Sequence, residues 1–159
     1  MTATGSFPAV RARDLEGLDV DLPDAFVGAR NLVAVAFRRE QQREVDSWVP
    51  WFEREATTDP ALRFYEVPAI GRWWAPFRPL IDGGMASAIR DPVVLRRTLT
   101  VYGDVGRVTG PLGITDRSRI TVCLVDGSGG VRWQGAGGCT AETAAALDAA
   151  LTTMRDADG

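Results

Sequence analysis

The chain has 159 residues and a formal net charge of −3, a length that fits one domain with its own hydrophobic core. It contains no histidine and no lysine, since all 18 of its positive charges are arginine. These absences exclude Ser-His-Asp and Cys-His catalysis, histidine-ligated metals, Schiff-base lysines and the phosphate-binding lysine of P-loops.

The two cysteines, Cys123 and Cys139, do not form a Cys-x-x-Cys motif, and two thiols alone cannot hold zinc. The first seven residues show no secretory signal, and no apolar run approaches the roughly 18 residues of a membrane span. Arginine in place of lysine is typical of a GC-rich bacterial genome. We therefore expect a bacterial, cytoplasmic protein with reduced thiols, no membrane span, and neither a cofactor nor a metal. Mild acidity also disfavours nucleic acid as a partner.

Hydrophobic patterns in the first half of the chain predict two short strands and then a strand–helix–strand unit. Residues 1–9 are expected to form a flexible tail. The strands are expected at residues 10–15, 18–22, 32–37 and 62–67. An amphipathic stripe predicts a helix from residue 41 to 56 with a kink at Pro50, and Pro68 is expected to end the last strand.

The second half predicts two further helices, a hairpin and a C-terminal helix. Helices are expected at residues 79–90, 92–98 and 140–154, the last one capped by Thr140. Strands are expected at residues 99–102, 120–126 and 131–134, the last two joined by a glycine-rich turn. Residues 103–113 are expected to be a glycine-rich loop with one helical turn at most.

A βαβ unit followed by β-β-α is the connectivity of the thioredoxin fold. We predict a single α/β domain over residues 10–155, with a central mixed sheet flanked by helices. The extra N-terminal strands are common in the peroxiredoxin-like branch of that fold. Strands 32–37 and 120–126 are expected to be central, and strand 131–134 is expected at the edge, where it could pair into a homodimer.

Several short motifs recur in one order along the chain. Asn-Leu-Val-Ala-Val-Ala-Phe-Arg at 31–38 is followed by Asp-Ser-Trp at 46–48 and Leu-Gly-Ile at 112–114. Leu-Val-Asp at 124–126 then precedes Val-Arg-Trp at 131–133 and a glycine-rich link into Glu142. From residue 20 to 154 this set resembles the thioredoxin-like ATP synthase assembly factors (the Atp-ten group) and their bacterial relatives. The resemblance implies a thioredoxin-like fold without a redox dithiol, and an assembly role rather than an enzyme activity.

The reactive position of a thioredoxin fold follows the first buried strand, which here is residues 38–43. It holds no cysteine, serine or threonine, so we expect neither a dithiol oxidoreductase nor a peroxidase. Arg38 and Arg39, beside Glu40, could instead bind a carboxylate or phosphate near a helix N-terminus. Two alternatives stay open: Arg38 could pair with a carboxylate such as Glu66 or Asp126, and Arg39 could simply face water.

Other candidates come from aromatic side chains and from a glycine-flanked cysteine. Cys139, at the entrance of the last helix, is either a nucleophile with a lowered pKa or a small cap residue. Trp73 and Trp74 either line a ligand or partner surface or pack against the sheet. The full set predicted to bind is Arg38, Arg39, Glu40, Trp48, Trp73, Trp74, Arg119 and Trp133.

Two functions remain open at this point. One is a binding or assembly module that recognises a protein partner, or a small anionic or aromatic ligand, through an arginine-rich cleft. The other is a cofactor-free isomerase, cyclase or lyase of bacterial specialised metabolism that uses the same cleft. Its catalytic candidates are Arg38, Tyr65, Glu66 and Cys139, with arginine stabilising negative charge and a carboxylate or tyrosine moving a proton.

Overall fold

A computed structural model describes residues 5–14, 16–70, 98–103 and 105–158 of the chain. The helix predicted at 79–90 lies outside these residues, as does all but the last residue of the helix predicted at 92–98. Trp73 and Trp74, both predicted to bind, also lie outside them.

The described residues contain a five-stranded mixed sheet with the order β5-β4-β3-β6-β7. The strands are β3 (Arg30–Ala36), β4 (Leu62–Ile70), β5 (Val101–Tyr102), β6 (Thr121–Asp126) and β7 (Val131–Ala136). β3 runs parallel to β4 and antiparallel to β6, and β6 and β7 form the predicted hairpin. The central positions of β3 and β6 and the edge position of β7 are confirmed.

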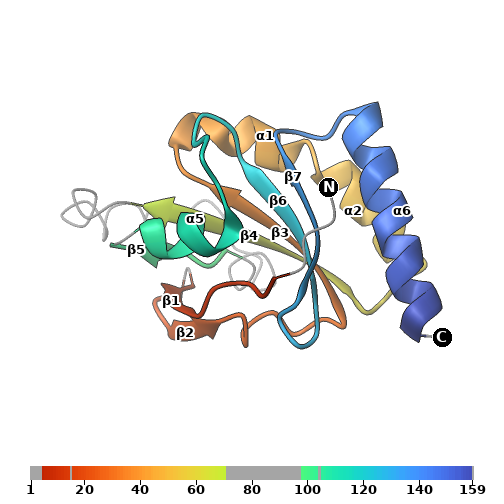
Figure 1. Cartoon of the computed structure of the whole chain (residues 1–159), viewed down its shortest axis with the longest axis horizontal. Coiled ribbons are helices and arrows are strands. Elements are labelled where there is room, and N and C mark those ends of the chain that lie inside the picture. The colour runs from red at the N-terminus through yellow and green to blue at the C-terminus, as the bar shows by residue number, and fades with distance from the viewer. Residues whose placement is uncertain (1–4, 15, 71–97, 104, 159) are drawn as a thin grey trace.

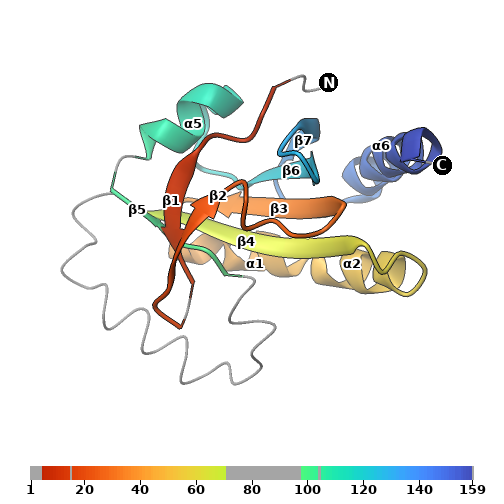
Figure 2. The same ribbon diagram turned by 90° about the horizontal axis from the view of Figure 1, so that it is seen from below.

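A smaller two-stranded sheet, β1 (Val10–Arg13) and β2 (Asp19–Leu22), packs on one face of the main sheet. Figure 2 shows it on the same side as α5 (Gly106–Leu112). The segment that precedes β1 belongs to the predicted flexible tail, yet Phe7 is only 2% exposed and its N–H donates to the Gly129 carbonyl at 2.8 Å. From Gly5 onward this segment is therefore anchored to the fold.

The opposite face of the main sheet is covered by α1 (Gln42–Asp46), α2 (Val49–Ala56) and α6 (Ala141–Asp158), as Figure 1 shows. Because β3 is buried on both faces, its alternate side chains enter two separate cores. Val33 and Val35 pack with the β1–β2 side, whereas Leu32 and Ala34 pack with the helices. The continuous apolar run that predicted a doubly covered strand is thereby explained.

The predicted helix 41–56 is divided into three pieces. A 3-10 turn η1 (Arg39–Gln41) leads into α1, and α2 starts after Ser47 and Trp48. Pro50 lies in the first turn of α2, where a missing N–H breaks no helical hydrogen bond. The break therefore falls before the proline rather than at it, because the ring would clash with the preceding turn of a continuous helix.

Two other boundaries differ from the sequence prediction. β4 continues through Pro68, which lies opposite Ala36 at the end of the β3–β4 ladder; from Ala69 onward β4 pairs with β5 instead. The predicted loop at 103–113 contains α5, whose C-cap Gly113 has a φ of 65°. Glycine is preferred at a helix end with this left-handed conformation. Because glycine is also typical of loops, composition alone predicts a loop here.

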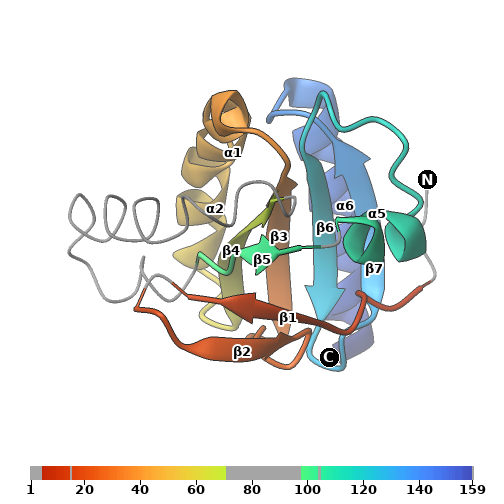
Figure 3. The same cartoon turned by 90° about the vertical axis from the view of Figure 1, so that its left-hand side faces the viewer.

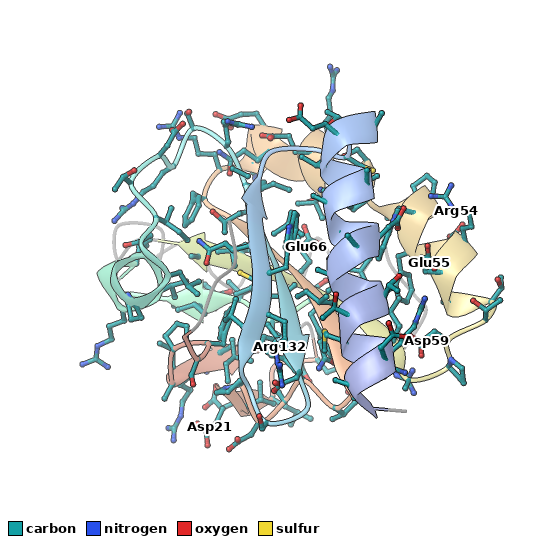
Figure 4. The ribbon with its side chains drawn as sticks, turned by 45° about the vertical axis from the view of Figure 1, so that its right-hand side comes forward. Asp21, Arg54, Glu55, Asp59, Glu66 and Arg132 are labelled. Atoms are coloured by element: carbon teal, nitrogen blue, oxygen red, sulfur yellow. The ribbon has the colours of Figure 1, made fainter. Side chains whose placement is uncertain are left out.

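A buried ion cluster joins three elements at the end of the sheet opposite to the β3–α1 connection. Asp59, in the loop between α2 and β4, accepts two hydrogen bonds of 2.8 Å from Arg30 at the start of β3. It also accepts hydrogen bonds of 3.2 and 3.1 Å from Arg155 of α6. Figure 4 shows Asp59 and Glu55 beside the C-terminal turns of α6. The Arg30 hydrogen bonds, opposed by burial and reinforced by Arg155, lower the pKa of Asp59 to about 2.

Candidate functional site

Three connections meet at the carboxyl end of β3. Since β6 and β7 run antiparallel, Thr121 at the start of β6 lies between Val35 of β3 and Ala136 at the end of β7. The connections 37–41, 114–120 and 137–140 therefore come together at one end of the sheet, the upper end in Figure 3. We call this the loop surface. It includes the position where a thioredoxin fold carries its reactive thiol.

Gln41 fixes the geometry of the loop surface. Its side chain is 3% exposed, and its Oε1 accepts hydrogen bonds from the backbone N–H groups of Phe37 (2.8 Å) and Arg38 (3.2 Å). Its Nε2 donates to the Arg117 carbonyl at 2.7 Å. One buried amide thus caps the 3-10 turn and ties the first connection to the second.

Exposed arginines surround this tie. Arg38, Arg39, Arg117 and Arg119 are all solvent-exposed. Arg119 Nη2 donates to the Ala136 carbonyl at 3.0 Å, and its guanidinium lies so close to Gly137 that a Cβ there would meet Nη2 at 2.7 Å. Within the described residues Arg38 forms no ion pair, and so it pairs with neither Glu66 nor Asp126. Asp126 lies at the opposite end of β6, where it pairs with Arg132 at 2.7 Å.

Asp116 is an acidic group that the charges of Arg119 and Arg38 reach. Hydrogen bonds from Ser118 lower its pKa, and the charges of Arg119 and Arg38 contribute in the same direction. The carboxylate is exposed and therefore stays ionised at neutral pH. Glu40 is also exposed on the η1 turn, so the loop surface carries both signs of charge, with arginine in excess.

Two tryptophans predicted to bind belong to the core instead. Trp48 is 1% exposed, and its indole N–H donates to the Gly137 carbonyl at 3.2 Å. Trp133 is 8% exposed and packs in the helix-side core with Leu147 of α6. Both rings help to pack the helices on the sheet, so the structure gives them a core position in place of the exposed position expected of a binding surface.

The proposed catalytic set is not assembled around Arg38. Tyr65 and Glu66 are consecutive on β4 and so face opposite sides of the sheet. Tyr65 is buried in the β1–β2 core, where its hydroxyl accepts a hydrogen bond from the Val27 N–H at 3.1 Å. Glu66 lies opposite Ala34, two residues before the end of β3. Arg38 lies beyond the end of the strand, in the β3–α1 connection.

The two cysteines lie on opposite faces of the sheet. Cys123 is fully buried in the β1–β2 core, and burial raises its pKa to about 12. Cys139 is half-buried against the helix-side core, where desolvation raises its pKa although the charge of Arg54 lowers it in part. The Cys139 N–H donates to the Ser47 hydroxyl at 2.8 Å. The lowered pKa expected at the helix entrance is therefore not found, and Cys139 packs as a small structural residue.

The sequence reading missed Gln41, Ser47, Asp116 and Arg117. Gln41 has a recognisable signal, because a glutamine at the third position of a helical turn can reach back to the preceding backbone N–H groups. Ser47 has none, since its hydroxyl contacts Cys139, a residue 92 positions away in sequence. In the described part of the chain, no group of three His, Cys, Asp or Glu side chains could hold a metal ion.

Solved structures that resemble this chain are thioredoxin-like. The thioredoxin domain of a thiol-disulfide oxidoreductase from Bacteroides vulgatus matches with a TM-score of 0.54 and 22% identity, over 86% of this chain and 90% of that one. A thiol:disulfide interchange protein from Bacteroides sp. matches with a TM-score of 0.55 and 18% identity, over 83% and 80%. Yeast Sco1 matches with a TM-score of 0.57 and 14% identity, over 83% and 84%. No protein-family model and no curated protein sequence matches the chain.

These likenesses confirm the predicted thioredoxin-like α/β fold, with its mixed sheet, flanking helices and added N-terminal strands. At such low identity they show the fold alone, and they do not reach the narrower Atp-ten resemblance. The helices within the described residues include none long and apolar enough to cross a bilayer.

Proposed function

We propose that this protein is a redox-inactive thioredoxin-like binding module that recognises an acidic segment of a partner protein through its loop surface. The observation that carries the proposal is the replacement of a reactive thiol by Arg38 and Arg39 on a loop held rigid by Gln41. Both guanidinium groups are exposed and form no ion pair with another described residue, and such groups can form bidentate bonds to carboxylates or phosphates.

The electrostatics of the loop surface support an anionic partner rather than a catalytic step. Arg38, Arg39 and Arg119 are exposed around a rigid turn, and rim charges of this kind steer association and set specificity. The enzyme alternative has no specific observation in its favour, because Tyr65 and Glu66 face opposite sides of β4. The sequence resemblance makes ATP synthase subunits the first partners to examine. A cytoplasmic location stays a proposal that fits two free thiols.

The test is quantitative partner capture from cells that express the tagged protein. We expect Arg38→Glu to reduce captured partners at least tenfold relative to the unmodified protein, because the new carboxylate repels an acidic segment. Arg107→Glu, on the exposed face of α5, is the matched control and should retain them. A parallel insulin-reduction assay should show no activity. Equal capture by Arg38→Glu, or turnover of insulin disulfides, would contradict the proposal.

A further inference from the structure

β7 is the outer strand of the sheet, and the described N-terminal residues from Gly5 onward pair with the first part of it. The Val131 N–H donates to the Gly5 carbonyl at 2.7 Å, and Ser6 forms an antiparallel bridge with Gly130. The edge of β7 thus already accepts an extended backbone in one defined direction.

The rest of this edge offers backbone groups to a further strand. The Gly137 N–H donates inward to the Ile120 carbonyl, so by alternation the N–H and C=O groups of Gln134 and Ala136 point outward. The Ala136 carbonyl accepts the Arg119 guanidinium at 3.0 Å, which agrees with that orientation. No described strand pairs with residues 132–136 on this side.

A groove of about 540 Å³ runs beside this open edge, on the face that carries α5. Its apolar wall includes Leu112, Ile114 and Val131, and its polar groups include Asp116, Thr121 and Gln134. A groove of this size with few polar groups is typical of ligand sites. The described residues of its lining include no arginine, so the groove is distinct from the arginines of the loop surface, although Asp116 borders both.

Thr121 supplies a second, independent sign of a ligand. Thr121 is 4% exposed and lines the groove, and it lies on the same face of β6 as Cys123. Its hydroxyl has no hydrogen-bond partner among the described residues, although buried hydroxyls are nearly always paired. A polar group of an occupant in the groove would satisfy it.

We propose that this groove and the open edge of β7 bind an extended peptide segment of a partner protein by antiparallel strand addition. The segment runs antiparallel beside β7, pairs its backbone with Gln134, and inserts an apolar side chain against Leu112 and Ile114. A main-chain group of the segment reaches the Thr121 hydroxyl. An extended peptide fits better than a compact molecule because the outward N–H and C=O groups of Gln134 and the outward N–H of Ala136 are spaced as in a strand along the groove.

The test uses a phage-displayed library of random linear heptapeptides, panned on the full chain. We expect enriched peptides with an apolar centre, which as synthetic peptides shift the backbone amide resonances of Ile114, Thr121 and Gln134. Thr121→Val should weaken their binding about fivefold through loss of one hydrogen bond. The same variant should keep the melting temperature of the free protein, since it removes a hydroxyl without a partner. Thr152→Val, on the exposed side of α6, is the control and should bind normally.

Gln134→Pro gives an independent reading, because proline on an outward-facing edge position removes a donor that β6 does not use. It should abolish peptide binding while the far-UV spectrum stays unchanged. The proposal is overturned if panning enriches no peptide, if resonance shifts are confined to residues 38–41, or if Thr121→Val binds as well as the unmodified chain. Self-association through this edge, measured by analytical ultracentrifugation without peptide, would assign the edge to a second copy and likewise overturn it.

Discussion

Removing the Asp59 carboxylate should reveal how strongly the ion cluster holds α6 to the sheet. Asp59→Asn keeps the shape of the side chain but removes the buried carboxylate that pairs with Arg30, which is 13% exposed. Breaking a buried pair in this way costs about 3 to 5 kcal/mol. Arg155 is 34% exposed and keeps Glu55 at 3.6 Å, so it can turn toward water, and we expect a loss near about 3 kcal/mol.

The dependence of stability on acid pH gives a second estimate of what the Asp59 carboxylate contributes. A pKa lowered from 3.8 to about 2 corresponds to about 2.4 kcal/mol of stability. Because the folded form binds its proton more weakly, this contribution is complete above the unfolded pKa and is lost as pH falls from about 5 through 2. The pKa of Asp126 is also about 2, because hydrogen bonds from Ser128 and Arg132 outweigh its burial. Asp126 therefore also contributes to the loss of stability in acid, and the Asp59→Asn variant retains that contribution.

Urea unfolding followed by tryptophan fluorescence measures both quantities, since Trp48 and Trp51 are each 1% exposed in the native state. Asp59→Asn should lower the unfolding free energy at pH 7 and flatten its decline between pH 5 and 2. Asp21→Asn, whose pair with Arg11 is exposed at both partners, is the control and should change stability by less than about 0.5 kcal/mol. A loss below about 1 kcal/mol in Asp59→Asn, or an unaltered acid slope, would refute the reasoning.

Three other predictions concern the loop surface. Gln41→Ala should cost about 2 kcal/mol in urea unfolding, because three hydrogen bonds of a buried amide are lost, whereas Gln42→Ala should stay within about 0.5 kcal/mol; equal effects would show that the tie is unimportant. Gly137→Ala should cost about 1 to 2 kcal/mol in the same assay, since its φ is 86° and the new methyl meets Arg119; an unchanged midpoint would contradict this. Iodoacetamide should label Cys139 more slowly than free cysteine at pH 8, because the pKa of Cys139 is raised, and the labelling rate of Cys139 should increase as the pH is raised further. Cys139→Ser should abolish labelling of the native protein. Labelling of Cys139 as fast as that of free cysteine would refute the prediction.

The fold was predictable because the composition of the central strands indicates them directly. The runs at 32–37 and 120–126 consist mostly of apolar residues that suit a strand covered on both faces, and both became central strands of the sheet. Boundaries that depend on context were not predictable. Pro68 ends a strand only if its missing N–H breaks a ladder, and here Pro68 lies at the end of the β3 ladder while β4 continues beside β5 on its other side.

The site was harder to predict because polar contacts between distant residues leave no periodic signal. Trp48 belongs to an amphipathic stripe that fits both a core and a ligand face, and only the Gly137 carbonyl beside its N–H decides for the core. The position of Arg38 beyond the end of a central strand was predictable, but whether Arg38 pairs with Asp126 depends on where Asp126 lies along β6. Hydrophobic periodicity indicates which face of a helix or strand a residue lies on, but it says little about which residue its side chain contacts.

The antiparallel return of β6 and β7 explains why the two proposed binding surfaces lie so close together. Because β6 starts where β3 ends, residues 114–120 must pass over the end of the sheet, where one side contacts Gln41 and the other borders the β7 groove. Asp116 lies in that connection, within reach of the charges of Arg38 and Arg119, and it also lines the groove. An acidic partner that recruits those arginines takes positive charge from beside Asp116. The same connection then presents an uncompensated carboxylate to the groove, which favours a peptide whose end near Asp116 is basic.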